Sequence, residues 1–212
     1  MNLHTQNRPS ELDLRHRTPG APTMGLRPWL IWTAGFLSFP LAGLAGTAVA
    51  GRVDDPMAAL VGGLVTGGVI GAAQGLASSR RLPLIRWMFA TAVGMGLGLL
   101  LGAVAVGYGT SLGDLAAMGA ITGLLLGAAQ AAVLPTDRRK RAVWAIAMPV
   151  LWATGWTVTT LAGINVEQAF TVFGATGAVT FSALSGALLH RLLPILPTFT
   201  SGPRKNLTKD HA

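Results

Sequence analysis

Long apolar stretches separated by short polar connectors make up most of the chain. Residues 87–113 and 142–165 contain no Asp, Glu, Lys or Arg, and an uncharged, mostly apolar run of about 18 or more residues is typical of a helix that crosses a bilayer. The gaps between charges predict six spans, at about residues 29–50, 57–77, 87–107, 115–134, 142–164 and 169–193. At about 1.5 Å per residue, each is long enough to cross a hydrocarbon core of about 30 Å.

One segment occurs twice along the chain. GLVTGGVIGAAQ at residues 63–74 returns as GAITGLLLGAAQ at residues 119–130, so the offset is 119 − 63 = 56 residues. Gly51, Gly107 and Gly163 follow the same spacing. A unit of this length holds two spans, and short connectors join antiparallel neighbours. The pattern predicts an all-α membrane protein with six transmembrane helices as three pseudo-repeated antiparallel hairpins, at about 27–81, 86–139 and 142–193.

Polar segments flank this predicted transmembrane domain of residues 27–193. We expect residues 1–26 to form a disordered cytoplasmic tail and residues 194–212 a cytoplasmic C-terminal tail. The first apolar run ends in Ala48-Val49-Ala50, which also fits the cleavage site of a signal peptide. Because this run is in register with two later ones, we expect it to be retained.

Glycine recurs at every fourth position within both copies of the repeated segment. On a helix such positions form one side-chain-free stripe, which is typical of close packing between transmembrane helices. We therefore expect a helix-packing role for Gly63, Gly67, Gly71, Gly75, Gly119, Gly123 and Gly127. In the third unit the stripe survives only as small residues, either Gly174, Ala178, Ser182 and Gly186 or Ala175, Ala183 and Ala187. A stripe left uncovered within the chain would be available to another helix.

Charge is distributed unevenly between the two sets of connectors. Of the 16 Lys and Arg residues, four lie in residues 1–27, three in the second connector, four in the fourth connector and four from Arg191 onward. Arg52 is the exception. The positive-inside rule then predicts both termini in the cytoplasm, in a bacterial inner membrane. We expect the basic connectors to contact anionic lipids. Because these residues sit in short flanks of apolar spans, we expect no nucleic-acid partner.

The inventory for catalysis is small. Every Asp and Glu falls in a tail or connector, cysteine is absent, and the four histidines are not paired at metal-ligand spacing. We therefore predict no catalytic residue, no metal site, no cofactor and no enzymatic activity. Asp55 and Glu167 in the outer connectors leave two interpretations: an acidic mouth that attracts cations, or carboxylates that cap the following helix.

Gln74 and Gln130 are the intramembrane polar residues that need a partner most, because an unpaired buried amide is costly. Trp32, Trp87 and Trp144 open the odd-numbered spans at about the same depth. The glutamines could accept hydrogen bonds from these indoles, or the tryptophans could anchor the helices in an interfacial aromatic belt. The tryptophans are spaced by 55 and 57 residues, each one residue away from the repeat of 56. This difference weighs against strict hydrogen-bonded pairing.

Trp152 and Trp156 lie near the middle of the fifth span, far from either interface. At positions i and i+4 they share one helix face. Two interpretations stay open: an aromatic wall along a substrate path, or packing into the hollow beside a glycine stripe.

The combination of a tryptophan opening one helix, GxxxGAAQ closing the next and an arginine pair after it (Arg80 and Arg81, Arg138 and Arg139) resembles a group of uncharacterised bacterial glycine-rich polytopic membrane proteins. The resemblance covers residues 27–193 and implies a fold without an activity. From the residues themselves we expect a non-enzymatic interaction or scaffold subunit whose partner is a membrane protein or a second copy. The alternative is a small-solute channel or transporter built from three pseudo-repeats.

Overall fold

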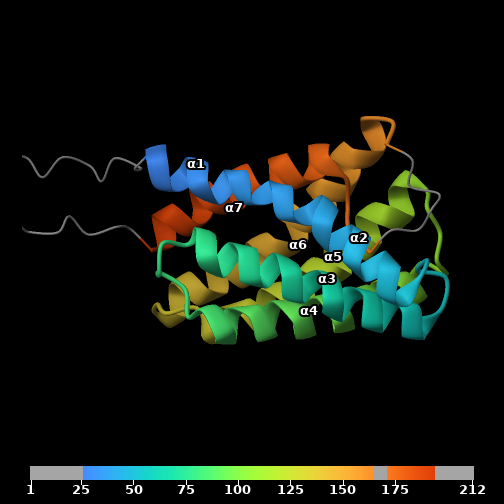
Figure 1. The fold of residues 1–212 in the computed structure, drawn as a ribbon, viewed down its shortest axis with the longest axis horizontal. Coiled ribbons are helices and arrows are strands. Elements are labelled where there is room, and N and C mark those ends of the chain that lie inside the picture. Colours follow the sequence, from blue (N-terminus) through green and yellow to red (C-terminus); the bar gives the residue numbers. More distant parts are fainter. Residues whose placement is uncertain (1–25, 165–170, 194–212) are drawn as a thin grey trace, which may run out of the picture.

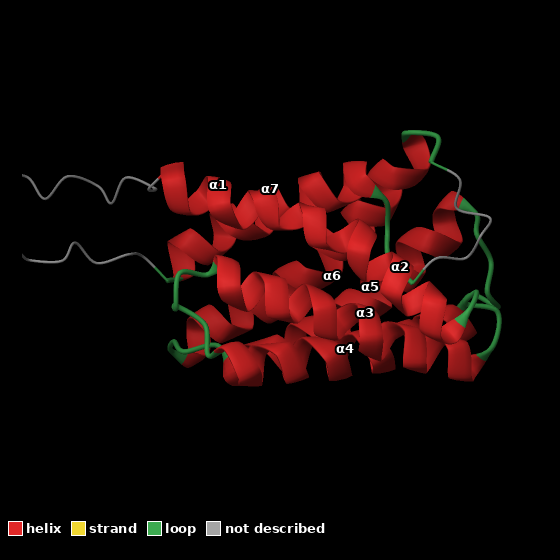
Figure 2. Cartoon of the chain, in the orientation of Figure 1, coloured by secondary structure: helices red, strands yellow, loops and turns green. Residues whose placement is uncertain are grey.

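The computed structural model describes residues 26–164 and 171–193 (Figure 1). In these ranges all regular structure is helical and no strand forms (Figure 2). The elements are α1 (Leu26–Ala34), η2 (Gly35–Leu37), α2 (Ser38–Ala50), α3 (Pro56–Ala77), α4 (Leu84–Ala105), α5 (Leu112–Val133), α6 (Arg138–Leu161) and α7 (Ala175–Leu192). Apart from Leu26, both predicted tails lie outside the described residues.

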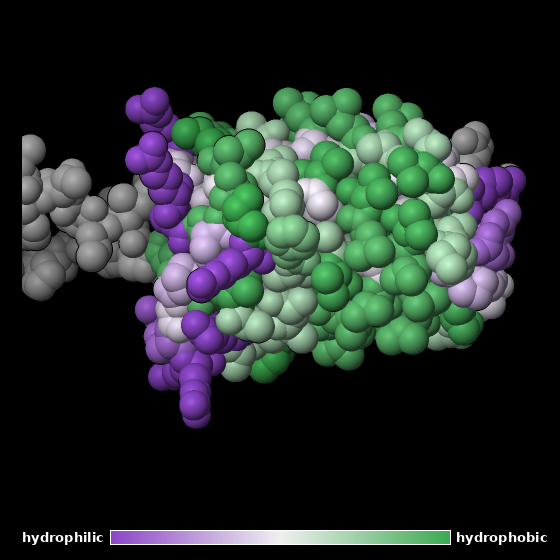
Figure 3. All heavy atoms as spheres, turned by 60° about the horizontal axis from the view of Figure 1, so that its bottom comes forward, coloured by the Kyte–Doolittle hydropathy of each residue, from purple (hydrophilic) through white to green (hydrophobic). Residues whose placement is uncertain are grey.

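Five helical segments are long and apolar enough to cross a membrane. They are Leu26–Ala50, Pro56–Ala77, Leu84–Ala105, Leu112–Val133 and Arg138–Leu161. Large apolar side chains on these helices point outward; Leu76 and Ile146, for example, are each 72% exposed. Figure 3 shows a broad hydrophobic band across one face of the molecule, with hydrophilic residues gathered at its two ends. Such a band is unfavourable in water and favourable in lipid, so the predicted membrane class is confirmed.

The sixth helix is shorter than the sequence predicts. A span at 169–193 was expected, but α7 begins at Ala175 and has 18 residues, which at about 1.5 Å per residue is about 27 Å. It is not among the five segments that meet the length and hydropathy requirements of a span. Residues 171–174 precede it in a non-helical conformation that carries Phe173 into the core. The beginning of this predicted span, 169–170, lies outside the described residues.

The helices form a closed ring. Each packs against its neighbour in the chain, from α2 and α3 through α6 and α7, and α1 and α2 also contact α7. Leu26 at the start of α1 and Leu192 at the end of α7 consequently lie at the same end of the bundle (Figure 1). No helices on opposite sides of the ring approach each other closely within the described residues. Buried side chains such as Trp152 and Phe181 pack in its interior.

A short 3₁₀ turn interrupts the first span. Pro40 has no N–H to donate to the carbonyl of Phe36, which removes one α-helical hydrogen bond. The helix tightens at η2, directly before this position, and Ser38 donates a side-chain hydrogen bond of 2.7 Å to the carbonyl of Gly35. In contrast, α6 runs without interruption through Pro149.

Side chains in the connectors cap the helices. Asp55 Oδ1 accepts hydrogen bonds from the backbone N–H groups of Met57 (2.7 Å) and Ala58 (2.9 Å) at the start of α3. Ser111 and Asp114 form a capping box at the start of α5. The capping interpretation of Asp55 is thus confirmed, whereas Glu167 lies outside the described residues.

Glycines end three of the helices in a left-handed conformation. Gly51, Gly107 and Gly163 have φ values of 76°, 58° and 70°, which residues with a Cβ rarely adopt. At the latter two, Tyr108 N–H bonds to the carbonyl of Ala103 and Ile164 N–H to that of Thr159, the hydrogen bond of a Schellman motif. The 56-residue spacing therefore coincides three times with a glycine of positive φ at a helix end, and the Schellman hydrogen bond forms at two of these ends.

Candidate functional site

Both glycine stripes are covered by neighbouring helices of the same chain. A Cβ added to Gly63 would lie 2.8 Å from Gly96 Cα on α4, and one added to Gly123 would lie 2.8 Å from Pro149 Cα on α6. Gly67, Gly71 and Gly75 likewise face α4, and Gly119 and Gly127 face α6. Since backbone atoms occupy the space, these glycines hold the chain's own helices together and are not free for another helix.

The third unit uses one of the two small-residue registers considered from the sequence. Ala178, Ser182 and Gly186 on α7 are buried, whereas Ala175 is exposed. A Cβ at Gly186 would lie 2.6 Å from the Trp32 ring and 3.3 Å from that of Trp29. Small residues on α7 thus leave room for the tryptophans of α1 at the closure of the ring.

The tryptophans that open the odd-numbered spans are buried and hydrogen bonded. Trp87 Nε1 donates to Gln74 Oε1 at 3.1 Å, and Trp144 Nε1 donates to Gln130 Oε1 at 3.0 Å. The two rings contact each other edge to face, with centroids 5.8 Å apart. Their exposed fractions are 0% and 1%, so they face the interior and not an interfacial belt. Of the two alternatives, the hydrogen-bonded one describes these residues.

Sequence reasoning missed the residue that joins the two pairs. Gln130 Nε2 donates a hydrogen bond of 3.0 Å to Thr91 Oγ1, and Thr91 in turn donates to the carbonyl of Trp87 at 2.8 Å. The network therefore joins α3, α4, α5 and α6 near one end of the ring. Thr91 lies one turn after Trp87, a spacing that could have marked it as a partner.

A related contact closes the ring between α7 and α1. Trp32 Nε1 donates to Ser185 Oγ at 3.1 Å, and Trp29 Nε1 donates to the carbonyl of Ala183 at 3.0 Å. The same arrangement occurs at Trp32, Trp87 and Trp144. Each lies early in its span and donates to a polar side chain late in the preceding helix around the ring. The serine takes the place of glutamine in the third unit.

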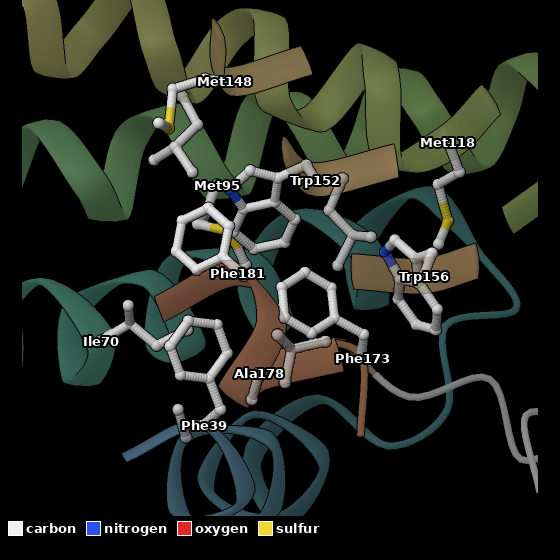
Figure 4. Packing of buried hydrophobic residues seen from close by; sticks show 14 of the residues in the cluster. Phe39, Ile70, Met95, Met118, Met148, Trp152, Trp156, Phe173, Ala178 and Phe181 are labelled. Atoms are coloured by element: carbon white, nitrogen blue, oxygen red, sulfur yellow. The ribbon is translucent and has the colours of Figure 1, made fainter. Parts of the chain in front are cut away.

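Aromatic side chains fill the ring closer to its other end (Figure 4). Trp152 lies with its ring centroid 4.8 Å from that of Phe173 and 5.6 Å from that of Phe181. Phe39 of α2 stacks on Phe173 at 5.4 Å, and all four are at most 2% exposed. Trp156 packs against the Gly119 position of α5. Trp156 thus packs beside the glycine stripe, as one of the two interpretations proposed, whereas the Trp152 ring packs against Phe173 and Phe181.

The two ends of the molecule differ in charge. Of the ten Lys and Arg residues that the structure describes, nine lie at the end formed by the start of α1, the end of α7 and the α3–α4 and α5–α6 connectors, which we call the basic end. Arg52 lies at the other end with Asp54, Asp55 and Asp114. At the start of α6, Lys140 forms an ion pair with Asp137 at 3.6 Å.

A cleft of about 530 Å³ opens at the basic end between the α3–α4 and α5–α6 connectors. Its lining combines four arginines with apolar residues: Arg80, Arg81, Arg86, Arg141, Leu82, Pro83, Ala132, Val133 and Pro135. Arg141 Nε donates to the carbonyl of Leu134 at 2.9 Å. No carboxylate lines the cleft among the residues that the structure describes, so its positive charge is available to an anion.

Arg81 is partly buried. Its Nε donates to the carbonyl of Ser78 at 2.8 Å and its Nη1 to that of Leu193 at 3.3 Å. Burial lowers the pKa of its guanidinium, and its Nη2 is buried without a hydrogen-bond partner among the described residues. Nearby on α7, His190 is buried and its Nδ1 lies 2.7 Å from the carbonyl oxygen of Gly186.

Comparison of the chain with models of known protein families, with functionally curated proteins and with solved structures finds no match. Among the described residues, no group of three His, Asp or Glu side chains is close enough to hold a metal ion. The fold itself defines the class: the chain is an integral membrane protein made of apolar helices.

Proposed function

We propose that the protein is a non-enzymatic binding or scaffold subunit of the bacterial inner membrane. The filled centre of the helical ring carries this proposal. Trp152, Phe173 and Phe181 occupy the interior at one level, and the network of Trp87, Gln130 and their partners occupies it at another. A channel or small-solute transporter needs a hydrated path, so this packing favours binding over transport.

The partner would bind outside the ring. Because α4 and α6 cover the glycine stripes, the surfaces left for a second copy or another membrane protein are the outward apolar faces and the basic end. Exposed leucines alone do not distinguish protein from lipid, since lipid tails are as apolar as leucine. The charge difference between the ends is the more selective feature.

Orientation follows from the same charge difference. The first and last described helices both meet the basic end, and the positive-inside rule favours placing that end in the cytoplasm. Anionic headgroups of the cytoplasmic leaflet are then the nearest counter-charges for its arginines.

Three hairpins related by duplication are part of this proposal. The positive φ values at Gly51, Gly107 and Gly163 support it, as do the three related tryptophan contacts to Gln74, Gln130 and Ser185. Membership of the group of glycine-rich polytopic proteins that the sequence resembles is proposed on the same pattern.

Purification in native lipid, without crosslinker, tests the binding role. The tagged chain is extracted in polymer-bounded discs, and its companions are quantified by mass spectrometry. We expect a second copy or another membrane protein in an amount comparable to the chain itself. A solitary monomer would contradict the proposal. In a parallel flux assay, proteoliposomes should take up small solutes no faster than protein-free vesicles, and protein-dependent uptake would favour the transport alternative.

A further inference from the structure

We propose that the cleft at the basic end is a specific site for the phosphate headgroup of an anionic phospholipid, whose acyl chains lie along α4 and α5. The site rests on the cytoplasmic orientation proposed above, but not on the presence of a protein partner. It would make the lipid a bound component of the protein and not merely its solvent.

Charge and hydrogen-bonding capacity favour a phosphate in this cleft. Guanidinium groups present several N–H donors in a plane, a geometry that suits phosphate oxygens. The side chains of Arg80 and Arg86 are exposed and take part in no hydrogen bond with the described residues. The cleft therefore offers several donors without an acceptor at one location.

The surface beside the cleft favours a lipid over free phosphate as the source. Arg86 lies on the same face of α4 as Phe89, Val93 and Leu97, at helical spacings of three, four and four residues. These three apolar side chains are 60%, 47% and 43% exposed. An exposed apolar track thus runs from the arginine toward the middle of the bilayer.

The neighbouring helix α5 provides the second wall. Ala132 lines the cleft, and Ala128 and Leu124, one and two turns earlier, are exposed on the same face. Small residues at two of these three positions leave space beside α4, which packs directly on α5. A headgroup held at the cleft would therefore place its acyl chains against both helices.

Lipid titration of the purified protein in detergent tests this site. Phosphatidylglycerol and phosphatidylcholine are added separately, and the midpoint of thermal denaturation is followed, since a ligand that binds the folded state raises it. We expect phosphatidylglycerol to raise the midpoint and phosphatidylcholine to leave it nearly unchanged. Inorganic phosphate at the same concentration should give no rise, because it lacks the acyl chains.

Two double variants remove the same charge from the same end of the protein. Arg80→Gln with Arg86→Gln changes the cleft, and Arg139→Gln with Arg191→Gln changes exposed arginines that do not line it. The cleft variant should need at least about tenfold more phosphatidylglycerol for the same rise, and the control should stay within about twofold of wild type. Arg86→Gln alone, expected to show an intermediate shift, replaces the double variant if that one does not fold.

Equal weakening by both double variants would overturn the proposal, because it would mean that a diffuse field attracts the lipid. An equal rise with inorganic phosphate would also overturn it, by removing the role of the acyl chains. If no protein partner co-purifies while the two variants still differ in the titration, the scaffold function fails and the lipid site stands.

Discussion

Replacing Gln130 by leucine breaks the buried network at its centre. Gln130 is 1% exposed; it accepts a hydrogen bond of 3.0 Å from Trp144 and donates one of 3.0 Å to Thr91. Two lost hydrogen bonds cost about 1–3 kcal/mol together, with values inside bilayers toward the lower end. The indole N–H left unpaired adds about 1–3 kcal/mol.

The expected loss of stability for Gln130→Leu is therefore about 2–4 kcal/mol. At about 2–4 °C per kcal/mol for a chain of this size, the midpoint of thermal denaturation in detergent should fall by about 4–16 °C. Gln74→Leu, which removes a single hydrogen bond, should cost less. Thr122→Val is the matched control on the same helix, because the Thr122 hydroxyl is buried without a partner among the described residues and its removal should be neutral or stabilising.

A double-mutant cycle separates the hydrogen bond from packing. Trp144→Phe combined with Gln130→Leu removes both partners, so the double variant should be more stable than the sum of the single effects predicts, by about 0.6–1.7 kcal/mol. If Gln130→Leu melts at the wild-type temperature, the network does not stabilise the fold and the reasoning fails.

Two further perturbations follow from local geometry. Gly67→Ala should destabilise the fold by about 1–3 kcal/mol through overpacking and so lower the denaturation midpoint, because its Cβ would lie 2.6 Å from the Thr91 carbonyl oxygen on α4. The Cβ of Gly68→Ala would meet nothing within 4 Å beyond the backbone of its own helix, so this change should be neutral or stabilising. Equal effects of the two changes would contradict the tight α3–α4 contact. At the start of α6, the backbone N–H of Lys140 lowers the pKa of Asp137. Asp137 should therefore stabilise the protein at pH values above the ordinary aspartate pKa of about 3.9, and this effect should be lost as the pH falls through the lowered pKa of the folded state. Asp137→Ala should remove that part of the pH dependence of the melting midpoint. An unchanged pH profile would show that the cap contributes nothing.

Much of the helical layout could be predicted from the sequence because a bilayer imposes simple requirements. Charge gaps placed five of the spans within a few residues of the observed helices, since charged side chains are excluded from a hydrocarbon core. The depth of Gln74 and Trp87 suggested that they could meet, but the sequence could not decide it. Whether an indole reaches an amide depends on the rotation of two packed helices, which the one-residue difference in tryptophan spacing left open.

The closure of the ring and the filling of its centre were beyond sequence reasoning. Phe173 precedes the short helix α7 in the most diverged unit, where no glycine stripe or regular spacing marked a core position. Ser185 replaces glutamine as the acceptor for Trp32, and nothing in the local sequence pairs a residue of α7 with one of α1. These contacts depend on the arrangement of the whole ring.

Aqueous accessibility of the ring's centre tests the closed interior most directly. The chain contains no cysteine, so a single introduced thiol can be labelled with a membrane-impermeant maleimide in vesicles opened to both sides. Ala178→Cys probes a fully buried position beside Phe39 and Phe181 (Figure 4), and Ser79→Cys and Gly113→Cys probe exposed positions at the two ends. We expect rapid labelling at both ends and none at Ala178→Cys. Labelling of Ala178→Cys at a rate close to that of the ends would reveal a hydrated path and contradict a sealed, non-transporting bundle.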